Sequence, residues 1–289
     1  MAAKPKPRTL VVVSDTHCGC RLALCPPQAI PLDDGGKYIP SDFQVKMWGL
    51  WREFWDEWVP EVTRGEAYDL VHNGDCVDGV HHGSTTQISH NMGDQLTIAR
   101  LAIGPEVERC KATGGTYYHI RGTEAHVGQS GVHEEQLARD LGAKPNEQGQ
   151  YARYDLWKRV GTPTKKVKAP LVHCLHHVGT TSSAAHESSA VNAELTSMYV
   201  ESARWGHEPP DFIVRSHRHR SIAVDLNSAK GYAAAIVTPA WQGKSPFAWK
   251  IPGARVSEPQ FGGIAIRAGD EEFYYRRKVW SFGRSAEEQ

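Results

Sequence analysis

Short runs of consecutive apolar residues recur along the chain, and such runs are typical of strands that are buried on both faces. The first, residues 9–14, reads Thr-Leu-Val-Val-Val-Ser, and the second, residues 68–72, leads directly into Asn73-Gly74-Asp75. The same reasoning predicts strands at 116–120, 151–158, 171–176, 211–214, 232–237, 263–267 and 272–279.

Amphipathic segments between these runs predict helices at 42–59, 93–112, 132–141 and 184–205, whereas the Pro- and Gly-rich stretch 20–41 predicts a loop. Ser41 supplies a cap for the first helix, and Pro105 predicts a break or kink in the second. The early alternation of strand and helix favours a layered α/β core, and the later strands favour a second sheet packed against the first.

The bulk composition is that of an ordinary globular protein. The chain has 289 residues, of which 40% are hydrophobic and 23% charged, so it can build a substantial core without a disulfide or a structural metal. We predict a single domain over residues 1–289, with flexible ends at 1–8 and 285–289.

Charge and cysteine usage narrow the function classes. Lys+Arg and Asp+Glu both total 33, and this zero net charge argues against a processive nuclease. The sequence has no apolar run long enough for a membrane span, so no membrane partner is expected. The six cysteines are interpreted as small buried residues in a reducing, cytoplasmic environment. The sequence does not indicate an oligomeric state.

Potential metal ligands follow most of the predicted strands. Ligand sites in α/β sheets lie at the carboxyl ends of the strands, so these side chains can converge in space. In extended backbone, residues two apart also point the same way, and both can then reach one ion. The groups are Asp15 and His17, Asp75 and Asp78, His126, His173 with His176 and His177, and His217 with His219.

The order of these groups resembles that of the calcineurin-like metallophosphoesterase superfamily, whose pattern is Asp-x-His, Gly-Asp-x-x-Asp, Gly-Asn-His, a strand-end His and Gly-His-x-His. The corresponding segments here are Asp15-Thr16-His17, Gly74-Asp75-Cys76-Val77-Asp78, Gly122-Thr123-Glu124-Ala125-His126, His176/His177 and Ser216-His217-Arg218-His219. The resemblance covers residues 9–219 and implies an α/β fold: a four-layer α/β/β/α sandwich of two mixed sheets.

The resemblance also implies roles for individual residues. Asp15, His17 and His219 would hold one metal ion, Asp75 would bridge two, and His217 with a strand-end histidine would hold the second. His126 would act as a proton donor near the leaving group, with Asp78 orienting it. Carboxylate and imidazole ligands suit two divalent ions, with Mn²⁺ preferred and Fe, Zn²⁺, Ni²⁺ or Co²⁺ as alternatives. A hydroxide shared by the two metals would attack phosphorus.

The third motif departs from the family pattern, because Thr123-Glu124-Ala125 precedes His126 where the family has an asparagine. The amide oxygen that would bind the second metal is therefore missing. The alternatives for its replacement are Thr123, Glu124, His81, His82 and Asn91. The Gly-Thr-x-x-His variant is similar to that of phosphoesterases of phage and prophage type.

The strand-end motif also departs, because His176 is followed by His177 where the family has glycine. Strand alternation places His173 and His177 on one face and His176 on the other. A strand that ends before His177 breaks this parity, so both residues stay candidates, and we favour His176 because it occupies the position of the family histidine. His81 and His82 border the site as metal or substrate contacts, or only solvate a loop.

The function expected from this pattern is metal-dependent hydrolysis of a phosphate ester, and a phosphodiester of a nucleotide or nucleic-acid end is preferred. The alternatives are a phosphomonoesterase or protein phosphatase, and a catalytically weak metal-binding scaffold for interactions. The natural substrate is not readable from the sequence.

Overall fold

The computed structural model describes residues 7–81, 83–179, 183–228, 231–251 and 253–283, and within these ranges the long strands form two sheets. The first sheet has the order β13-β12-β1-β4-β5-β6, with β1 (Thr9–Val13), β4 (Tyr68–Asn73), β5 (Tyr117–Ile120), β6 (Ala152–Arg153), β12 (Phe261–Ala268) and β13 (Phe273–Trp280). The second has the order β10-β11-β9-β8-β7, with β7 (Asp155–Arg159), β8 (Leu171–Leu175), β9 (Phe212–Arg215), β10 (Ile222–Ser228) and β11 (Gly231–Val237).

Both sheets are mixed. In the first, β1, β4, β5 and β6 run parallel, whereas β12 and β13 pair antiparallel. In the second, β8, β9 and β11 run parallel, whereas β7 and β10 pair antiparallel at the edges. A short hairpin, β2 (Ile30–Pro31) and β3 (Lys37–Tyr38), projects from the first helical layer.

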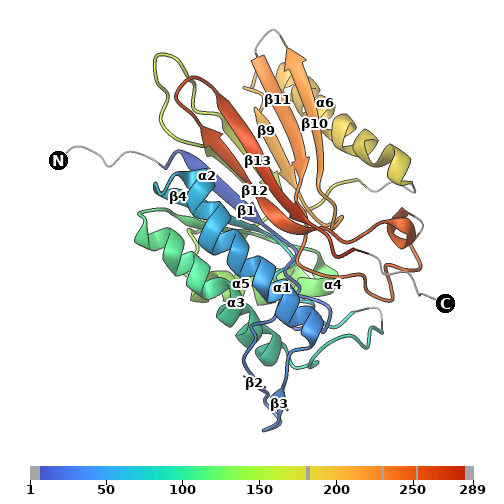
Figure 1. Cartoon of the computed structure of the whole chain (residues 1–289). Helices are drawn as coiled ribbons and strands as arrows, with labels where there is room; N and C mark the ends of the chain where they lie inside the picture. Colours follow the sequence, from blue (N-terminus) through green and yellow to red (C-terminus); the bar gives the residue numbers. More distant parts are fainter. Residues whose placement is uncertain (1–6, 82, 180–182, 229–230, 252, 284–289) are drawn as a thin grey trace.

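Helices cover the outer face of each sheet (Figure 1). The first sheet is covered by α1 (Asp42–Glu53), α2 (Val59–Thr63), α3 (Met92–Ala112) and α5 (Val132–Asp140), and the second by α6 (Glu187–Trp205). The short helical segments are η1 (Phe54–Trp58), α4 (Glu124–Val127), η2 (Gln129–Gly131), η3 (Ala184–His186) and η4 (Gly253–Val256). The predicted four-layer α/β/β/α sandwich of two mixed sheets is confirmed.

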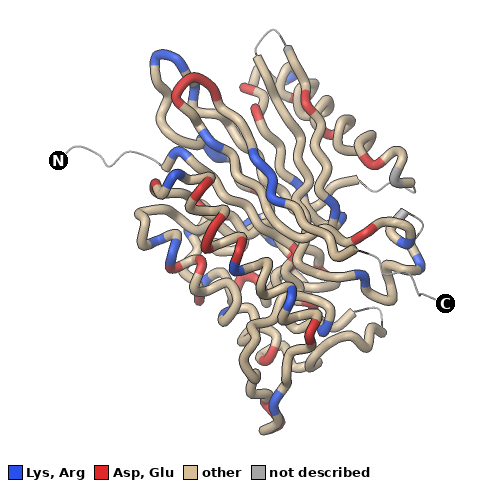
Figure 2. Tube along the Cα trace, in the orientation of Figure 1, with Lys and Arg blue, Asp and Glu red and all other residues tan. Residues whose placement is uncertain are grey.

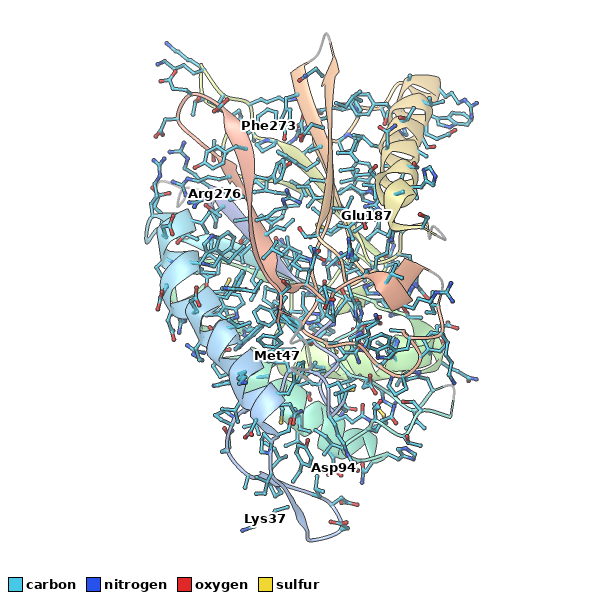
Figure 3. The ribbon with its side chains drawn as sticks, turned by 45° about the vertical axis from the view of Figure 1, so that its right-hand side comes forward. Lys37, Met47, Asp94, Glu187, Phe273 and Arg276 are labelled. Carbon is cyan, nitrogen blue, oxygen red and sulfur yellow. The ribbon has the colours of Figure 1, made fainter. Side chains whose placement is uncertain are left out.

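The alternation of side chains along β1 explains why this strand is apolar throughout. Leu10 and Val12 pack into the core between the two sheets, whereas Val11 and Val13 pack against the helices on the other face. Met47 on α1, labelled in Figure 3, belongs to the same core as Val11 and Val13, between the first sheet and its helices. Every residue of β1 is buried, and its one polar side chain, Thr9, accepts a hydrogen bond from Arg267 at 2.7 Å.

The local predictions need several corrections. The first helix does not end at residue 59, because a π-helical turn, η1, leads into α2, whose first turn contains Pro60. Helix α3 runs through Pro105 without a break, and the predicted loop 20–41 contains the β2–β3 hairpin. The predicted strand 151–158 is two strands, β6 and β7, which join different sheets. Strand β10 was not predicted.

The predicted flexible ends fall mostly outside the described residues. Arg8, which is described, donates hydrogen bonds to the carbonyl oxygens of Ala268 and Gly269 and pairs with Asp270, so this residue is held against the first sheet. The six cysteines are free and buried, as expected. No helix among the described residues combines the length and the apolar character that crossing a membrane requires.

Candidate metal centre

The candidate ligands lie on loops that leave the carboxyl ends of parallel strands. Asp15 and His17 follow β1, Asp75 follows β4, and His217 and His219 follow β9. All five have positive φ angles, between 40° and 69°, and they make up five of the seven such non-glycine residues in the described ranges. This backbone region is costly for residues with a Cβ, and strain of this kind gathers at functional sites.

Asp15, His17 and His219 form the first ligand group, and their donor atoms converge. The Nε2 atoms of His17 and His219 lie 3.1 Å apart, and Asp15 Oδ1 lies 3.4 Å from His219 Nε2 and 4.0 Å from His17 Nε2. Asp15 Oδ1 is buried and faces both ring nitrogens. Ligands that bind one divalent ion at about 2.1 Å lie roughly 3–3.5 Å from one another, so this group fits a metal ion.

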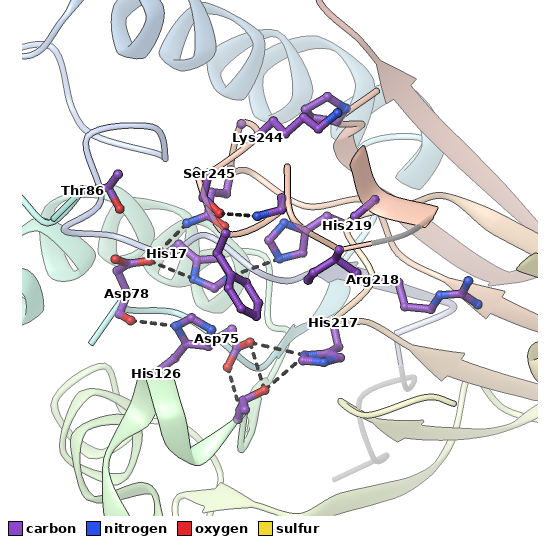
Figure 4. Close-up of a pocket in the computed structure, with 18 of the residues that line it drawn as sticks. His17, Asp75, Asp78, Thr86, His126, His217, Arg218, His219, Lys244 and Ser245 are labelled. Carbon is purple, nitrogen blue, oxygen red and sulfur yellow. Dashed lines mark hydrogen bonds and ion pairs between the residues drawn. The ribbon is translucent and has the colours of Figure 1, made fainter. Parts of the chain in front are cut away.

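Asp75, His176 and His217 form the second group (Figure 4 shows Asp75 and His217). Asp75 Oδ2 lies 3.0 Å from His176 Nε2 and 3.9 Å from His217 Nδ1. His176 Nδ1 donates to the carbonyl oxygen of Asn73 at 2.6 Å, so in the neutral ring Nε2 carries a lone pair toward the Asp75 carboxylate. Burial lowers the pKa of His176, but the Asp75 carboxylate outweighs burial and raises it to about 10, so without a metal Nε2 carries a proton toward Asp75. A divalent ion can take the place of this proton, and the geometry therefore also fits a metal.

The hydroxyl of Thr123 lies among the atoms of the second group. Thr123 Oγ1 is 3.3 Å from Asp75 Oδ2, 3.5 Å from His176 Nε2 and 3.2 Å from His217 Nδ1. Gly122, the residue before it, has no room for a side chain, since a Cβ there would lie 2.2 Å from Asp75 Oδ1. The glycine therefore lets the Thr123 loop reach the Asp75 loop.

Burial and neighbouring charges set the ionisation of the two carboxylates. Burial raises the pKa of Asp15 and of Asp75, but hydrogen bonds and charges from the histidines outweigh burial, and both pKa values lie below the ordinary value of 3.8. The chief opposing group is His219 for Asp15 and His176 for Asp75. Both carboxylates are thus ionised at neutral pH, as metal ligands must be.

Asp78 contacts the site in two ways. Its carboxylate lies 3.4 Å from His17 Nδ1 and accepts hydrogen bonds from Gln87 Nε2 at 2.8 Å and Gln242 Nε2 at 3.1 Å. His126 is contacted instead by the backbone carbonyl of Asp78, which accepts from Nδ1 at 2.7 Å. The side chain of Asp78 therefore orients His17, and its main chain orients His126.

The other residues named from the sequence divide into two sets. His81 lies in the same cavity, with its ring 4.3 Å from that of His126. His177 is exposed at the margin, with its ring 5.1 Å from His176 and 5.5 Å from His217.

The second set lies away from the ligands or outside the description. Asn91 is a correction, because its side chain caps α3 through Gly93 N and donates to Asp33, which keeps it from the site. Glu124 is exposed and belongs to none of the ligand groups among the described residues. His82 lies outside the described residues.

Glu134, which the sequence did not single out, links the loops that carry the second group. It is fully buried on α5, and its carboxylate accepts hydrogen bonds from Cys76 N at 3.0 Å and Gly122 N at 2.5 Å. These are the residues directly after Asp75 and directly before Thr123. Glu134 lies 58 residues from Cys76, and no local pattern marks it, so only the tertiary structure assigns it this role.

Glu134→Gln is expected to lower metal affinity about 10- to 100-fold, as loss of groups that support ligands commonly does. The amide presents an N–H to a backbone N–H, so the free energy of unfolding should also fall by about 1–3 kcal/mol. Competition with a chelating dye measures the first effect and urea unfolding the second. Glu135→Gln is the matched control: its partners are Tyr151 N and Ala152 N at the β6 edge, so only stability should change. Equal metal affinity in the two variants would contradict the role.

Comparison with known proteins yields no family model that matches the chain and no match among curated proteins. Solved structures do match. Vacuolar Protein Sorting 29 from Cryptosporidium parvum is 11% identical, with a TM-score of 0.33, and the match covers 96% of this chain and all of that one. The sulfate thiohydrolase SoxB from Thermus thermophilus is 11% identical, with a TM-score of 0.40, over 97% of this chain and 58% of that one, so the chain spans somewhat over half of SoxB.

Proposed function

We propose that this chain is a metal-dependent phosphoesterase that uses two divalent ions, with Mn²⁺ preferred, and that its substrate is a phosphodiester. The observation that carries the proposal is the convergence of two ligand groups, from four separate strand ends, beside one cavity that is also lined by His126. The sandwich that the resemblance implies is the observed one, and the ligand order along the chain is that of the calcineurin-like metallophosphoesterases.

The residues divide the work as follows. Asp15, His17 and His219 would hold one ion, His176 and His217 the other, and Asp75 would bridge them. Bound ions of this kind lower the pKa of water near neutrality and neutralise charge on the phosphate oxygens. Neighbouring groups orient the ligands: the Asp78 carboxylate contacts His17, and the Asn73 carbonyl accepts a hydrogen bond from His176.

Thr123 is proposed to supply the contact that the missing asparagine would make. Its hydroxyl lies within 3.5 Å of Asp75, His176 and His217, which supports a place in the second ligand group. A neutral hydroxyl is a weaker donor to a cation than an amide oxygen, so we expect the second ion to be held less tightly than the first.

The charges around the cavity support a diester over a monoester. A monoester carries more negative charge and calls for additional cations beside the metals. Here Arg220 pairs with Glu187, Arg218 donates to the Glu187 carbonyl, and Lys244 donates to carbonyl oxygens of its own loop. Glu187 lies at the end of α6 that faces the site (Figure 3), and Figure 2 shows acidic and basic residues interspersed along the chain.

The proposal is tested with metal-stripped protein to which Mn²⁺, Ni²⁺, Zn²⁺ or Mg²⁺ is restored. We expect cleavage of bis-p-nitrophenyl phosphate that depends on the added metal and is faster than cleavage of p-nitrophenyl phosphate. Faster cleavage of the monoester would overturn the diester assignment. Stoichiometric metal binding with no cleavage of either ester would contradict the proposed phosphoesterase activity and favour a metal-binding scaffold for interactions.

A further inference from the structure

The cavity at the metal centre has two unlike walls. Its volume is about 360 Å³, within the usual range for small-molecule sites. One wall carries the ligands and His126. The opposite wall comes from the segment that follows β11, and it presents four apolar side chains, which we call the apolar wall: Phe247, Ala248, Ile251 and Ala254.

Lys244, a cation of this segment that lines the cavity, is directed back into the segment. Lys244 Nζ lies 3.5 Å from the centre of the Trp249 ring and donates to the carbonyl oxygens of Arg255 and Ser257. The ammonium therefore bonds within its own loop, and the four apolar side chains line the cavity together with Ser245, Ser257 and Glu258. The apolar wall is suited to contact with an uncharged group.

The loop is fixed relative to the ligands by contacts at its start. Gln242 Nε2 donates to Asp78 Oδ1 at 3.1 Å, and Trp241 N donates to the carbonyl oxygen of Asp15 at 2.9 Å. Gly243 N adds a bond to Leu22 O at 2.7 Å. Figure 4 shows Lys244 and Ser245 across the cavity from Asp75 and His217. Asp78, which orients His17, therefore also holds the start of this loop.

We infer that the apolar wall binds an aromatic ring of the substrate, next to the phosphate held at the metal centre. Phe247 is 49% exposed and Ile251 39%, so both leave apolar surface in water at the mouth of a concave site. A flat aromatic group covers such surface and stacks on Phe247, whereas a methyl ester leaves most of it wet. The inference rests on the proposed function, because the phosphate fixes the position of the ring.

The test is calorimetric binding of methyl(phenyl)phosphinate and dimethylphosphinate to the Mn²⁺-loaded protein. Both are monoanions like a phosphodiester, and neither has an ester bond to cleave, so binding is measured without turnover. We expect methyl(phenyl)phosphinate to bind about tenfold more tightly, as burial of an aromatic ring on an apolar wall predicts. Phe247→Ala should remove most of this preference and leave the affinity for dimethylphosphinate unchanged.

Trp205→Ala is the matched control, since Trp205 is an aromatic residue, 71% exposed, at the far end of α6. It should keep the full preference for the phenyl compound. Equal affinity of the wild-type protein for the two phosphinates would overturn the inference and leave the proposed function standing. Failure of both to bind metal-loaded protein would remove the proposed function, and the inference with it.

Discussion

Asp75→Asn is expected to lower kcat/KM by about 10³-fold or more and to reduce the amount of bound metal. Asp75 is the residue proposed to serve both ions. Its Oδ2 faces His176 and His217, and its Oδ1 accepts the Thr123 N–H at 2.6 Å. An amide replaces one of these anionic oxygens with an N–H₂ group that can bind neither a metal nor a donor. The substitution therefore weakens the second metal site and removes the carboxylate that is proposed to link it to the first.

Metal content after dialysis, measured by elemental analysis, and cleavage of bis-p-nitrophenyl phosphate test this expectation together. Asp211→Asn is the matched control, because Asp211 is also buried, accepts Leu171 N and pairs with Lys168, but lies before β9, at the opposite end of the strand from His217. That variant should lose stability and keep its metal. An Asp75→Asn protein with full metal content and near wild-type turnover would refute the bridging role.

The fold was predictable where burial imposes a local pattern. The apolar run of β1 is buried on both faces, and the residues that follow it begin the site, as the sequence indicated. Strand β10 was missed because it lies at a sheet edge and pairs only with β11, a contact that its own residues do not encode. The segment 151–158 was predicted as one strand because its own residues do not encode their partners either. Its first half, β6, pairs with β5, and its second half, β7, pairs with β8 in the other sheet.

The sequence predicted which motifs converge at the site, but it could not predict which atoms come into contact. Strand parity could not decide between His176 and His177, because β8 ends at Leu175 and alternation no longer holds beyond it. The Asn73 carbonyl on the neighbouring strand orients His176. The sequence also linked Asp78 to His126, but it could not show that the Asp78 carbonyl makes the contact. Every residue has a main-chain carbonyl, so the identity of the side chain does not indicate which carbonyl accepts a hydrogen bond.

His126→Ala is expected to retain metal and lose turnover, with a loss that depends on the leaving group. Its Nδ1–H donates to the Asp78 carbonyl, which fixes the ring and leaves Nε2 to the cavity. Burial, followed by the charge of His17, lowers the pKa of His126 to about 4, so the ring is neutral at pH 7 before substrate binds. An adjacent phosphate anion raises that pKa and allows Nε2 to carry the proton that the departing oxygen takes up.

A basic leaving group needs this proton, whereas p-nitrophenolate departs without it. We therefore expect His126→Ala to cleave phenyl esters about 10²-fold more slowly and p-nitrophenyl esters at nearly the wild-type rate. His133→Ala is the control, because His133 packs against Gly128 outside the cavity lining and should leave both rates unchanged. Equal losses on both esters would indicate that His126 positions substrate or metal, and full activity on phenyl esters would exclude it as the proton donor.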